Sequence, residues 1–228
     1  MKKAIIFNLG DLDRFTVDPY TVLIDNGVDS SVDVIEFNEL AAAALKKGNP
    51  ELFALFADDA EYVCCASRPR TVRALLDFAE VDYRSKNISW FCVDYDETAL
   101  KSAHGTPWFP VIDRDRCTGC GICHDFCLFG TYVRDDSLDP SRRIQVANPL
   151  NCKVGCPACA RLCKSAALIF PFNPEPGING GFDDAASRAD SDLLKAFEAD
   201  PMKVLAERRK KRQLIAEQNL ADSEREIM

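Results

Sequence analysis

The stretch "RCTGCGICHDFC", residues 116–127, places four cysteines within eleven residues, at the spacing Cys117-x2-Cys120-x2-Cys123-x3-Cys127. Spacers of two residues let one loop present successive sulfur atoms to a single compact centre. Soft thiolate ligands select soft metals and iron–sulfur clusters. The stretch therefore predicts a metal or cluster site, and it leaves open what the more distant Cys127 binds.

The arrangement recurs in "NCKVGCPACARLC", residues 151–163, as Cys152-x3-Cys156-x2-Cys159-x3-Cys163. The first cysteines of the two runs lie 35 residues apart and the other three pairs lie 36 apart. The second run is therefore the first with one residue added, which indicates an internal duplication. Eight of the eleven cysteines lie in these two runs.

Across residues 107–172 the chain resembles the bacterial-type dicluster ferredoxins. In that family three close cysteines of each run hold one 4Fe–4S cluster, and the fourth cysteine of the run ligates the other cluster. The resemblance implies two 4Fe–4S clusters and an α+β ferredoxin-like dicluster domain. It implies these ligands for the first cluster: Cys117, Cys120, Cys123 and Cys163. It implies these for the second: Cys152, Cys156, Cys159 and Cys127.

The chain departs from the resembled family next to the fourth cysteine of each run. Proline usually follows it there, but Leu128 and Lys164 do so here. Lys164 would place a cation beside the first cluster, unless the side chain points into solvent. Gly119 and Gly121 lack side chains where backbone N–H groups would approach the cluster sulfurs. These features bear on the reduction potentials rather than on ligation.

Two other uses of the thiols fit the sequence less well. Zinc sites favour two separated pairs of ligands rather than four close cysteines repeated twice. The stretch "CGICH", residues 120–124, matches the attachment pattern of c-type haem. That use would require export and would leave Cys117 and Cys127 unexplained, so His124 is expected to be a polar loop residue.

Residues 1–105 alternate between strand-like and helix-like stretches. The expected strands are 4–8, 31–37, 61–67 and 87–95, and the expected helices are 20–27, 38–48, 49–59 and 69–81. This alternation predicts an α/β domain with a small parallel sheet flanked by helices. Asn38 and Ser67 are expected to cap their helices. Ligands of such sheets bind at the carboxyl ends of the strands.

Two features near those strand ends have alternative interpretations. The arginines of "SRPRTVRA", residues 67–74, are either surface residues or an anion site at a helix N-terminus. No GxGxxG or GxxxxGK[ST] motif supports a dinucleotide or P-loop site. Cys64, Cys65 and Cys92 are expected to pack in the core, with a thiol site at the sheet edge as the alternative.

The remaining segments have simpler patterns. Residues 131–146 are expected to form a hairpin with Asp139 and Pro140 in its turn. Residues 181–228 are charged and helix-prone, which predicts a helical tail interrupted at Pro201. The basic run 208–212 is expected to be a solvated helix face, with a docking strip for an acidic partner as the alternative.

Bulk properties limit the kinds of partner. The 228 residues are 47% hydrophobic and carry a net charge of −8, which argues against binding nucleic acid through its phosphates. No apolar stretch is long enough to span a membrane. The N-terminal apolar run is too short for a signal peptide, so a cytoplasmic location with reduced thiols is expected.

Together these patterns predict three domains: an α/β domain at 1–105, a dicluster domain at 106–180 and a charged helical tail at 181–228. The expected function is electron transfer, as a protein or subunit that relays single electrons to or from a partner oxidoreductase or larger complex. The alternative is a redox enzyme whose N-terminal domain binds a nucleotide, flavin or small substrate.

Overall fold

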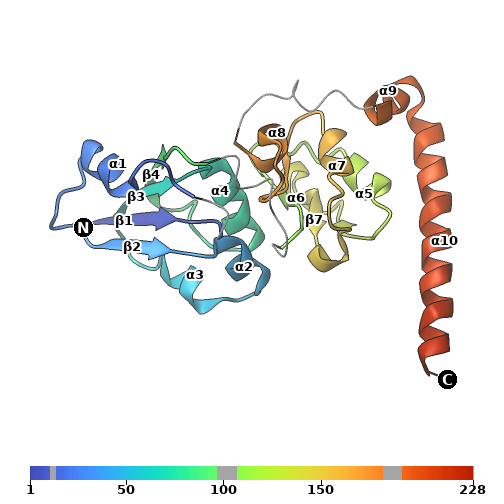
Figure 1. Cartoon of the computed structure of the whole chain (residues 1–228), viewed down its shortest axis with the longest axis horizontal. Helices are drawn as coiled ribbons and strands as arrows, with labels where there is room; N and C mark the ends of the chain where they lie inside the picture. Colours follow the sequence, from blue (N-terminus) through green and yellow to red (C-terminus); the bar gives the residue numbers. More distant parts are fainter. Residues whose placement is uncertain (11–13, 97–106, 182–191, 228) are drawn as a thin grey trace.

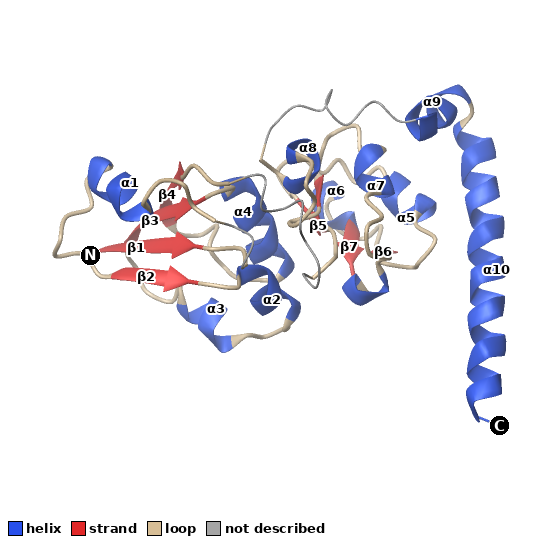
Figure 2. Cartoon of the chain, in the orientation of Figure 1, coloured by secondary structure: helices blue, strands red, loops and turns tan. Residues whose placement is uncertain are grey.

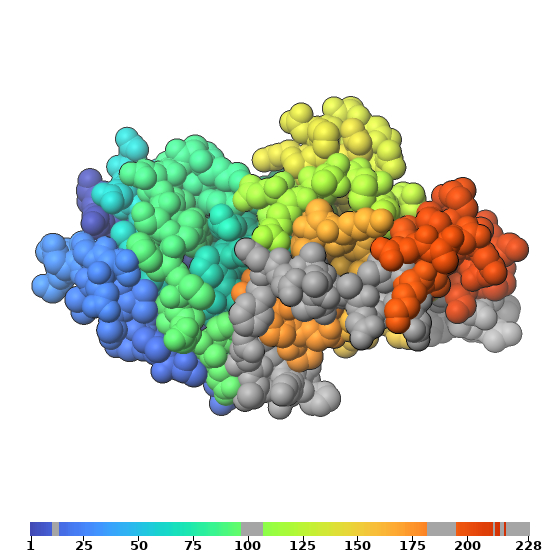
Figure 3. Space-filling model, turned by 90° about the horizontal axis from the view of Figure 1, so that it is seen from above, coloured from blue at the N-terminus to red at the C-terminus, as the bar shows by residue number. Residues whose placement is uncertain are grey.

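The computed structural model describes residues 1–10, 14–96, 107–181 and 192–227. We name three parts of it: the α/β half (1–96), the cysteine-rich segment (107–181) and the C-terminal helices (192–227). They lie in a row in Figure 1, and the space-filling view in Figure 3 shows the same order from a second direction. Whether they are separate folding domains stays a prediction.

The α/β half contains a sheet of four parallel strands in the order β2-β1-β3-β4 (Figure 2). Its strands are β1 (Lys2–Phe7), β2 (Val34–Phe37), β3 (Glu61–Ala66) and β4 (Asn87–Cys92). Its helices are α1 (Pro19–Asp25), α2 (Leu40–Leu45), α3 (Pro50–Ala54) and α4 (Pro69–Phe78). The predicted parallel sheet with flanking helices is confirmed.

Alternate residues of β1 and β3 point to opposite faces of this sheet, and the residues on both faces are buried. Ile5 and Cys64 belong to the core that includes residues of α2, α3 and α4. Ile6 and Cys65 belong to a second core that includes Leu23 of α1. Burial on both faces explains why the strands are nearly continuous apolar runs.

Two predicted helix caps are wrong. Helix α2 follows Glu39, whose left-handed backbone begins the helix without a side-chain cap, so Asn38 lies outside it. Helix α4 follows Arg68 rather than Ser67, again without a side-chain cap. Both positions are fixed by tertiary packing of the following apolar residues, which outweighs the local preference for a capping side chain.

The cysteine-rich segment is built from short elements. Strands β5 (Val111–Ile112) and β8 (Leu168–Ile169) pair antiparallel, as do β6 (Tyr132–Arg134) and β7 (Ile144–Val146). The second pair confirms the predicted hairpin, whose connection also contains α6 (Pro140–Arg143). The other elements are α5 (Ile122–Phe126), the 3₁₀ helix η2 (Pro149–Asn151), α7 (Ala158–Arg161) and α8 (Pro176–Asn179).

The α/β half and the cysteine-rich segment share one hydrophobic core. Phe109, Val111, Ile169 and Phe172 of the cysteine-rich segment are buried in the core that contains α4. The ring of Phe109 packs against that of Phe78, with 5.5 Å between the centroids. Helix α4 is therefore packed both against the sheet and against the β5–β8 pair.

The C-terminal helices are α9 (Asp192–Ala199) and α10 (Pro201–Ile227), which confirms the predicted break at Pro201. Near the break, Phe197 is buried against Phe126 and Leu162 of the cysteine-rich segment. Farther along, α10 extends along the outer side of the molecule (Figure 1). Within the described ranges, none of the helices is both long and apolar enough to cross a membrane.

Candidate functional site: two cysteine-lined cavities

The eight predicted cysteines line two cavities of the cysteine-rich segment. The cysteines of the first cavity are Cys117, Cys120, Cys123 and Cys163. Those of the second cavity are Cys127, Cys152, Cys156 and Cys159. In the described part of the chain, no three His, Cys, Asp or Glu side chains gather to hold a single metal ion. Each cavity thus takes three cysteines from one run and the fourth from the other run.

Two short helices produce this exchange. Helix α5 carries Cys123 to the first cavity and ends at Cys127, whose amide donates to the Cys123 carbonyl at 3.1 Å. One turn of helix advances the chain by about 5.4 Å, and Cys127, at the end of this turn, lines the second cavity. In the same way α7 carries Cys159 to the second cavity, and Cys163 follows it into the first. The x3 spacing of each run is one helical turn.

The thiols of each cavity perturb one another. Burial raises the pKa of Cys152 to about 12, and the charges of Cys127 and Cys156 add to this effect. Burial also raises the pKa of Cys117; the Gly119 amide and the Arg114 charge oppose this increase, and the charges of Cys163 and Cys120 add to it more weakly. Several thiolates gathered in a buried cavity require a compensating positive charge, which a metal cluster provides.

Polar groups donate to several of these sulfurs. The amide of Phe129 donates to Cys127 Sγ at 3.4 Å, and the amide of Ala167 donates to Cys163 Sγ at 3.3 Å. The hydroxyl of Tyr132 lies 3.0 Å from Cys159 Sγ, and both residues are buried. Such hydrogen bonds stabilise thiolate ligands and tune the potential of a bound cluster.

Gly119 and Gly121 are required by the backbone around the first cavity. Their φ angles are +69° and +81°, a region that residues with a side chain seldom adopt. A Cβ on Gly119 would lie 2.3 Å from the Pro140 carbonyl oxygen, and a Cβ on Gly121 would lie 2.8 Å from Arg134 Nη1. The two glycines therefore allow the cysteine loop to pack closely against the β6–α6–β7 hairpin.

Two of the three arginines in residues 67–74 fit neither of their predicted roles, whereas Arg73 is partly exposed, as the surface interpretation predicts. Arg68 and Arg70 are buried, at 1% and 8% exposure, so they are not surface residues. Arg68 Nη1 donates to the Pro171 carbonyl. Arg70 pairs with Asp113 and donates to the Ala166 carbonyl. The cysteine-rich segment covers both guanidinium groups, so they do not form an open anion site.

The carboxyl edge of the parallel sheet is covered by the end of the cysteine-rich segment. Thr71 Oγ1 donates to the Asn179 carbonyl at 2.6 Å. Phe172 approaches Gly10 so closely that a Cβ there would lie 2.9 Å from its ring. Residues 11–13 and 97–106, which follow the carboxyl ends of β1 and β4, lie outside the described residues. At the described strand ends, the chain itself fills the place where α/β sheets bind ligands.

The other predicted residues have mixed outcomes. Cys64 and Cys65 are fully buried, which confirms core packing, and burial raises the pKa of Cys65 to about 11. Cys92 is exposed, so its predicted core position is wrong. Lys164 is exposed, which agrees with the alternative in which its side chain points into solvent. All eleven cysteines are free of disulfide bonds.

Two residues near the second cavity were not singled out from the sequence. Tyr132 lies in the predicted hairpin, where only its strand position was recognised. Arg208 belongs to the basic run expected to face solvent, yet it lines the second cavity. The signal for Arg208 is its spacing of four residues from Val204, which packs on the cysteine-rich segment.

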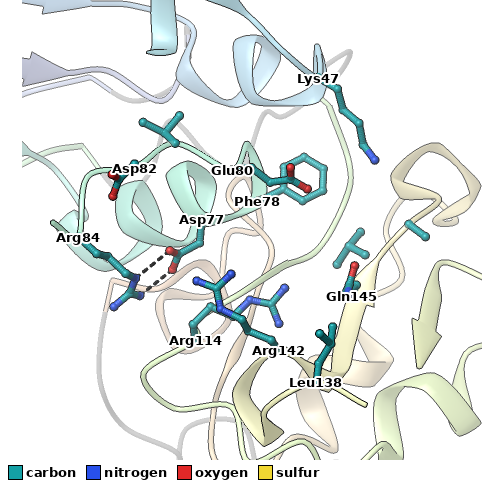
Figure 4. A pocket seen from close by; sticks show the side chains of 13 residues that line it. Lys47, Asp77, Phe78, Glu80, Asp82, Arg84, Arg114, Leu138, Arg142 and Gln145 are labelled. Atoms are coloured by element: carbon teal, nitrogen blue, oxygen red, sulfur yellow. Dashed lines mark hydrogen bonds and ion pairs between the residues drawn. The ribbon is translucent and has the colours of Figure 1, made fainter. Parts of the chain in front are cut away.

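A third cavity, of about 470 Å³, lies between the end of α4 and the hairpin (Figure 4). Arg84 pairs with Asp77 on one side, and Arg114 and Arg142 approach from the other. Nη1 of Arg114 is anchored by the carbonyls of residues 141 and 144, at 2.8 and 2.7 Å. Its described lining residues include no cysteine, and they come from both the α/β half and the cysteine-rich segment.

Comparison with known proteins agrees with the cysteine-lined cavities. A model of the 4Fe–4S binding domain matches residues 110–127. An uncharacterized ferredoxin of Methanocaldococcus jannaschii is 36% identical over 104 residues, which covers 42% of this chain and 67% of that protein. Ferredoxin-3 of Nostoc sp. is 38% identical over 76 residues, which covers 26% of this chain and 77% of that protein.

A further relative is a larger protein. The archaeal-type glutamate synthase [NADPH] of Dehalococcoides mccartyi is 39% identical over 66 residues, which covers 28% of this chain but only 12% of that protein. No solved structure matches the chain. Cysteines line both cavities, a 4Fe–4S binding domain matches the chain, and the chain covers about two thirds or more of both ferredoxins. We therefore conclude that the chain belongs to the ferredoxins and is a 4Fe–4S electron-transfer protein.

Proposed function

We propose that the chain relays single electrons through two 4Fe–4S clusters, one in each cysteine-lined cavity, within a ferredoxin-like dicluster fold. The observation that carries the proposal is the exchange of the fourth cysteine between the two runs. The proposed ligands of the first cluster are Cys117, Cys120, Cys123 and Cys163. The proposed ligands of the second are Cys127, Cys152, Cys156 and Cys159. The clusters supply the one-electron chemistry.

The surrounding residues hold the ligands and limit water. Ile112, Ile144 and Leu168 are buried and line the first cavity. Phe126 and Tyr132 are buried and line the second. An apolar wall lowers the local dielectric, so the nearby hydrogen-bond donors and charges act more strongly on the ligand sulfurs.

We propose that the redox partner is a larger oxidoreductase. Similarity to a short part of the NADPH glutamate synthases supports this, because the matched part is the iron–sulfur region of the present chain. The partner would give or take the electrons, and the α/β half would help to position the chain on it. A cytoplasmic location is part of the proposal, because reduced thiols are needed for cluster assembly.

The alternative function is a redox enzyme with a small-molecule site in the α/β half, and the structure limits where such a site could lie. The carboxyl edge of the sheet is covered, and the cavity in Figure 4 is the place where a ligand would contact that half and the cysteine-rich segment together. An absorption spectrum of anaerobically purified protein separates the two functions. Flavin bands or a co-purified nucleotide favour the enzyme.

Iron and acid-labile sulfide analysis of the anaerobic full chain tests the proposal. We expect about eight irons per chain, because two 4Fe–4S clusters are proposed. Cys159→Ser should lose about half of the iron, whereas Cys92→Ser, outside both cavities, should retain all of it. About four irons in the unaltered chain, or zinc in place of iron, would contradict two clusters.

A further inference from the structure

The C-terminal helices are docked beside the second cavity. Phe197 of α9 is buried together with Phe126 of α5 and Leu162, which follows α7. Val204 and Leu205, on the first turns of α10, pack on the same cluster. Since α5 and α7 carry cysteines to both cavities, this contact fixes the start of α10 next to the ligand-bearing helices.

Arg208 follows Val204 by four residues, so it lies on the same face of α10 one turn farther along. Its guanidinium carbon lies 3.9 Å from the centroid of the Phe126 ring, which is close cation–π stacking. Arg208 lines the second cavity together with Cys127, Cys152 and Cys156. The helix therefore brings a fixed positive charge to the wall of this cavity.

The surroundings of Arg208 leave its side chain available to a ligand of the cavity. Its Nε is buried and has no hydrogen-bond acceptor within the described part of the chain. Burial lowers its pKa, while the charges of Cys156 and Cys127 act in the opposite direction. An arginine remains charged under these conditions because its ordinary pKa is above 12. Cluster sulfurs would supply the acceptors that the guanidinium lacks.

We propose that Arg208 sets the reduction potential of the second cluster, with α10 acting as the arm that holds the charge in place. The inference rests on the proposed second cluster. Reduction adds one electron, and hence one negative charge, to the cluster without a change in covalent bonds. A positive charge at the cavity wall favours the reduced form and so raises the potential of this cluster.

The neighbouring residue provides a matched control. Arg209 is exposed on the same helix, so Arg209→Gln removes the same charge from the chain without changing the cavity wall. Arg208→Gln removes the charge at the wall, and Arg208→Lys keeps a charge but loses the planar stack on Phe126. The first cluster serves as an internal reference in every variant.

The experiment is a dithionite titration of the anaerobic full-length variants, followed by electron paramagnetic resonance. We expect Arg208→Gln to lower the reduction equilibrium constant of the second cluster about tenfold, or about 59 mV for one electron. The first cluster and the Arg209→Gln variant should change less than about threefold. Arg208→Lys should shift the second cluster in the same direction but by less than the glutamine variant.

The outcomes separate this inference from the proposed function. Equal shifts in Arg208→Gln and Arg209→Gln, or equal shifts of both clusters, would overturn the role of Arg208. If the glutamine variant binds too little iron, the lysine variant decides, and a shift confined to the first cluster overturns the inference. Iron analysis of the unaltered chain is independent: about four irons would refute the second cluster itself.

Discussion

Arg70 Nε donates to Asp113 Oδ2 at 2.6 Å, and both side chains are buried. The carbonyl of Asp113 accepts from the amide of Cys117, and Arg70 Nη2 donates to the carbonyl of Ala166, three residues after Cys163. Arg70 of the α/β half thus contacts two segments of the chain. One leads into Cys117 at the start of the first run, and the other follows Cys163 at the end of the second run.

Replacing this arginine should destabilise the protein. Arg70→Ala removes the closest cation from the buried Asp113 carboxylate and leaves it only the more distant Arg116, at 3.8 Å, which should cost up to about 3–5 kcal/mol. Arg73, on the same helix, is partly exposed and lies 4.0 Å from Asp115, so Arg73→Ala should cost about 0–1 kcal/mol. Urea unfolding of the anaerobic full chain, followed by circular dichroism, measures both. Similar losses in the two variants would show that the buried pair has no special importance.

The exchange of cysteines between the cavities makes a separate prediction. Cys127→Ser should damage the cluster of the second cavity, although Cys127 belongs to the first run in sequence. Cys117→Ser should damage the cluster of the first cavity. Reduced-state electron paramagnetic resonance of the two variants reports which cluster signal is lost. Loss of the same signal in both variants would refute the proposed ligand sets.

The hydroxyl of Tyr132 should tune the second cluster. Tyr132→Phe removes the group that lies 3.0 Å from Cys159 Sγ while preserving the buried ring. Loss of a donor to a ligand sulfur disfavours the reduced form, so the potential of the second cluster should fall and that of the first should change little. Tyr83→Phe is the control, because the Tyr83 hydroxyl donates to the Arg73 carbonyl, at 3.4 Å. A redox titration compares the two variants. Equal shifts in both would mean that the effect comes from altered folding and not from the hydroxyl beside Cys159.

The cysteines outside the cavities should differ in reactivity. The thiolate is the reactive form, and burial raises the pKa of Cys65 to about 11 and that of Cys64 further. At pH 8 iodoacetamide should therefore modify exposed Cys92 and spare the buried pair, as measured by peptide mass spectrometry. Rapid modification of Cys65 in the folded chain would contradict its burial.

The same shift predicts a loss of stability at alkaline pH. An unfolded thiol ionises near pH 8.5, whereas Cys65 in the folded chain does so near 11. The stability contributed by its neutral burial is complete below pH 8.5 and falls as the pH rises toward 11. Urea midpoints should drop between pH 8 and pH 10, and Cys65→Ala should reduce that drop.

Local sequence patterns predicted most elements of the fold. The predicted strands 4–8 and 61–67 correspond to β1 and β3 to within one or two residues at their ends, and the hairpin at 131–146 is set by its own turn residues. The crossed use of Cys127 followed from family resemblance, and its structural basis is one turn of helix. These features depend on residues close together in the chain, which is why the sequence reveals them.

Contacts between distant residues could not be predicted in this way. Arg68 and the Pro171 carbonyl are separated by 103 positions, and nothing in the stretch around Arg68 indicates that partner. The sequence alone therefore predicts either an exposed arginine or an anion ligand. The prediction that Arg208 faces solvent is wrong for the same reason, because a basic run has no local pattern that distinguishes a side chain that turns inward.

The two cysteine runs repeat one motif, and each cavity takes three cysteines from one run and one from the other. Arg70 supports the chain around the first cavity from the α/β half, whereas Arg208 reaches the second cavity from the opposite end of the molecule. Two sites built on one repeated motif are thereby made inequivalent by parts of the chain that are not repeated. The proposed relay would consequently have two distinguishable ends, and a partner that recognises one flank would meet one particular cluster first.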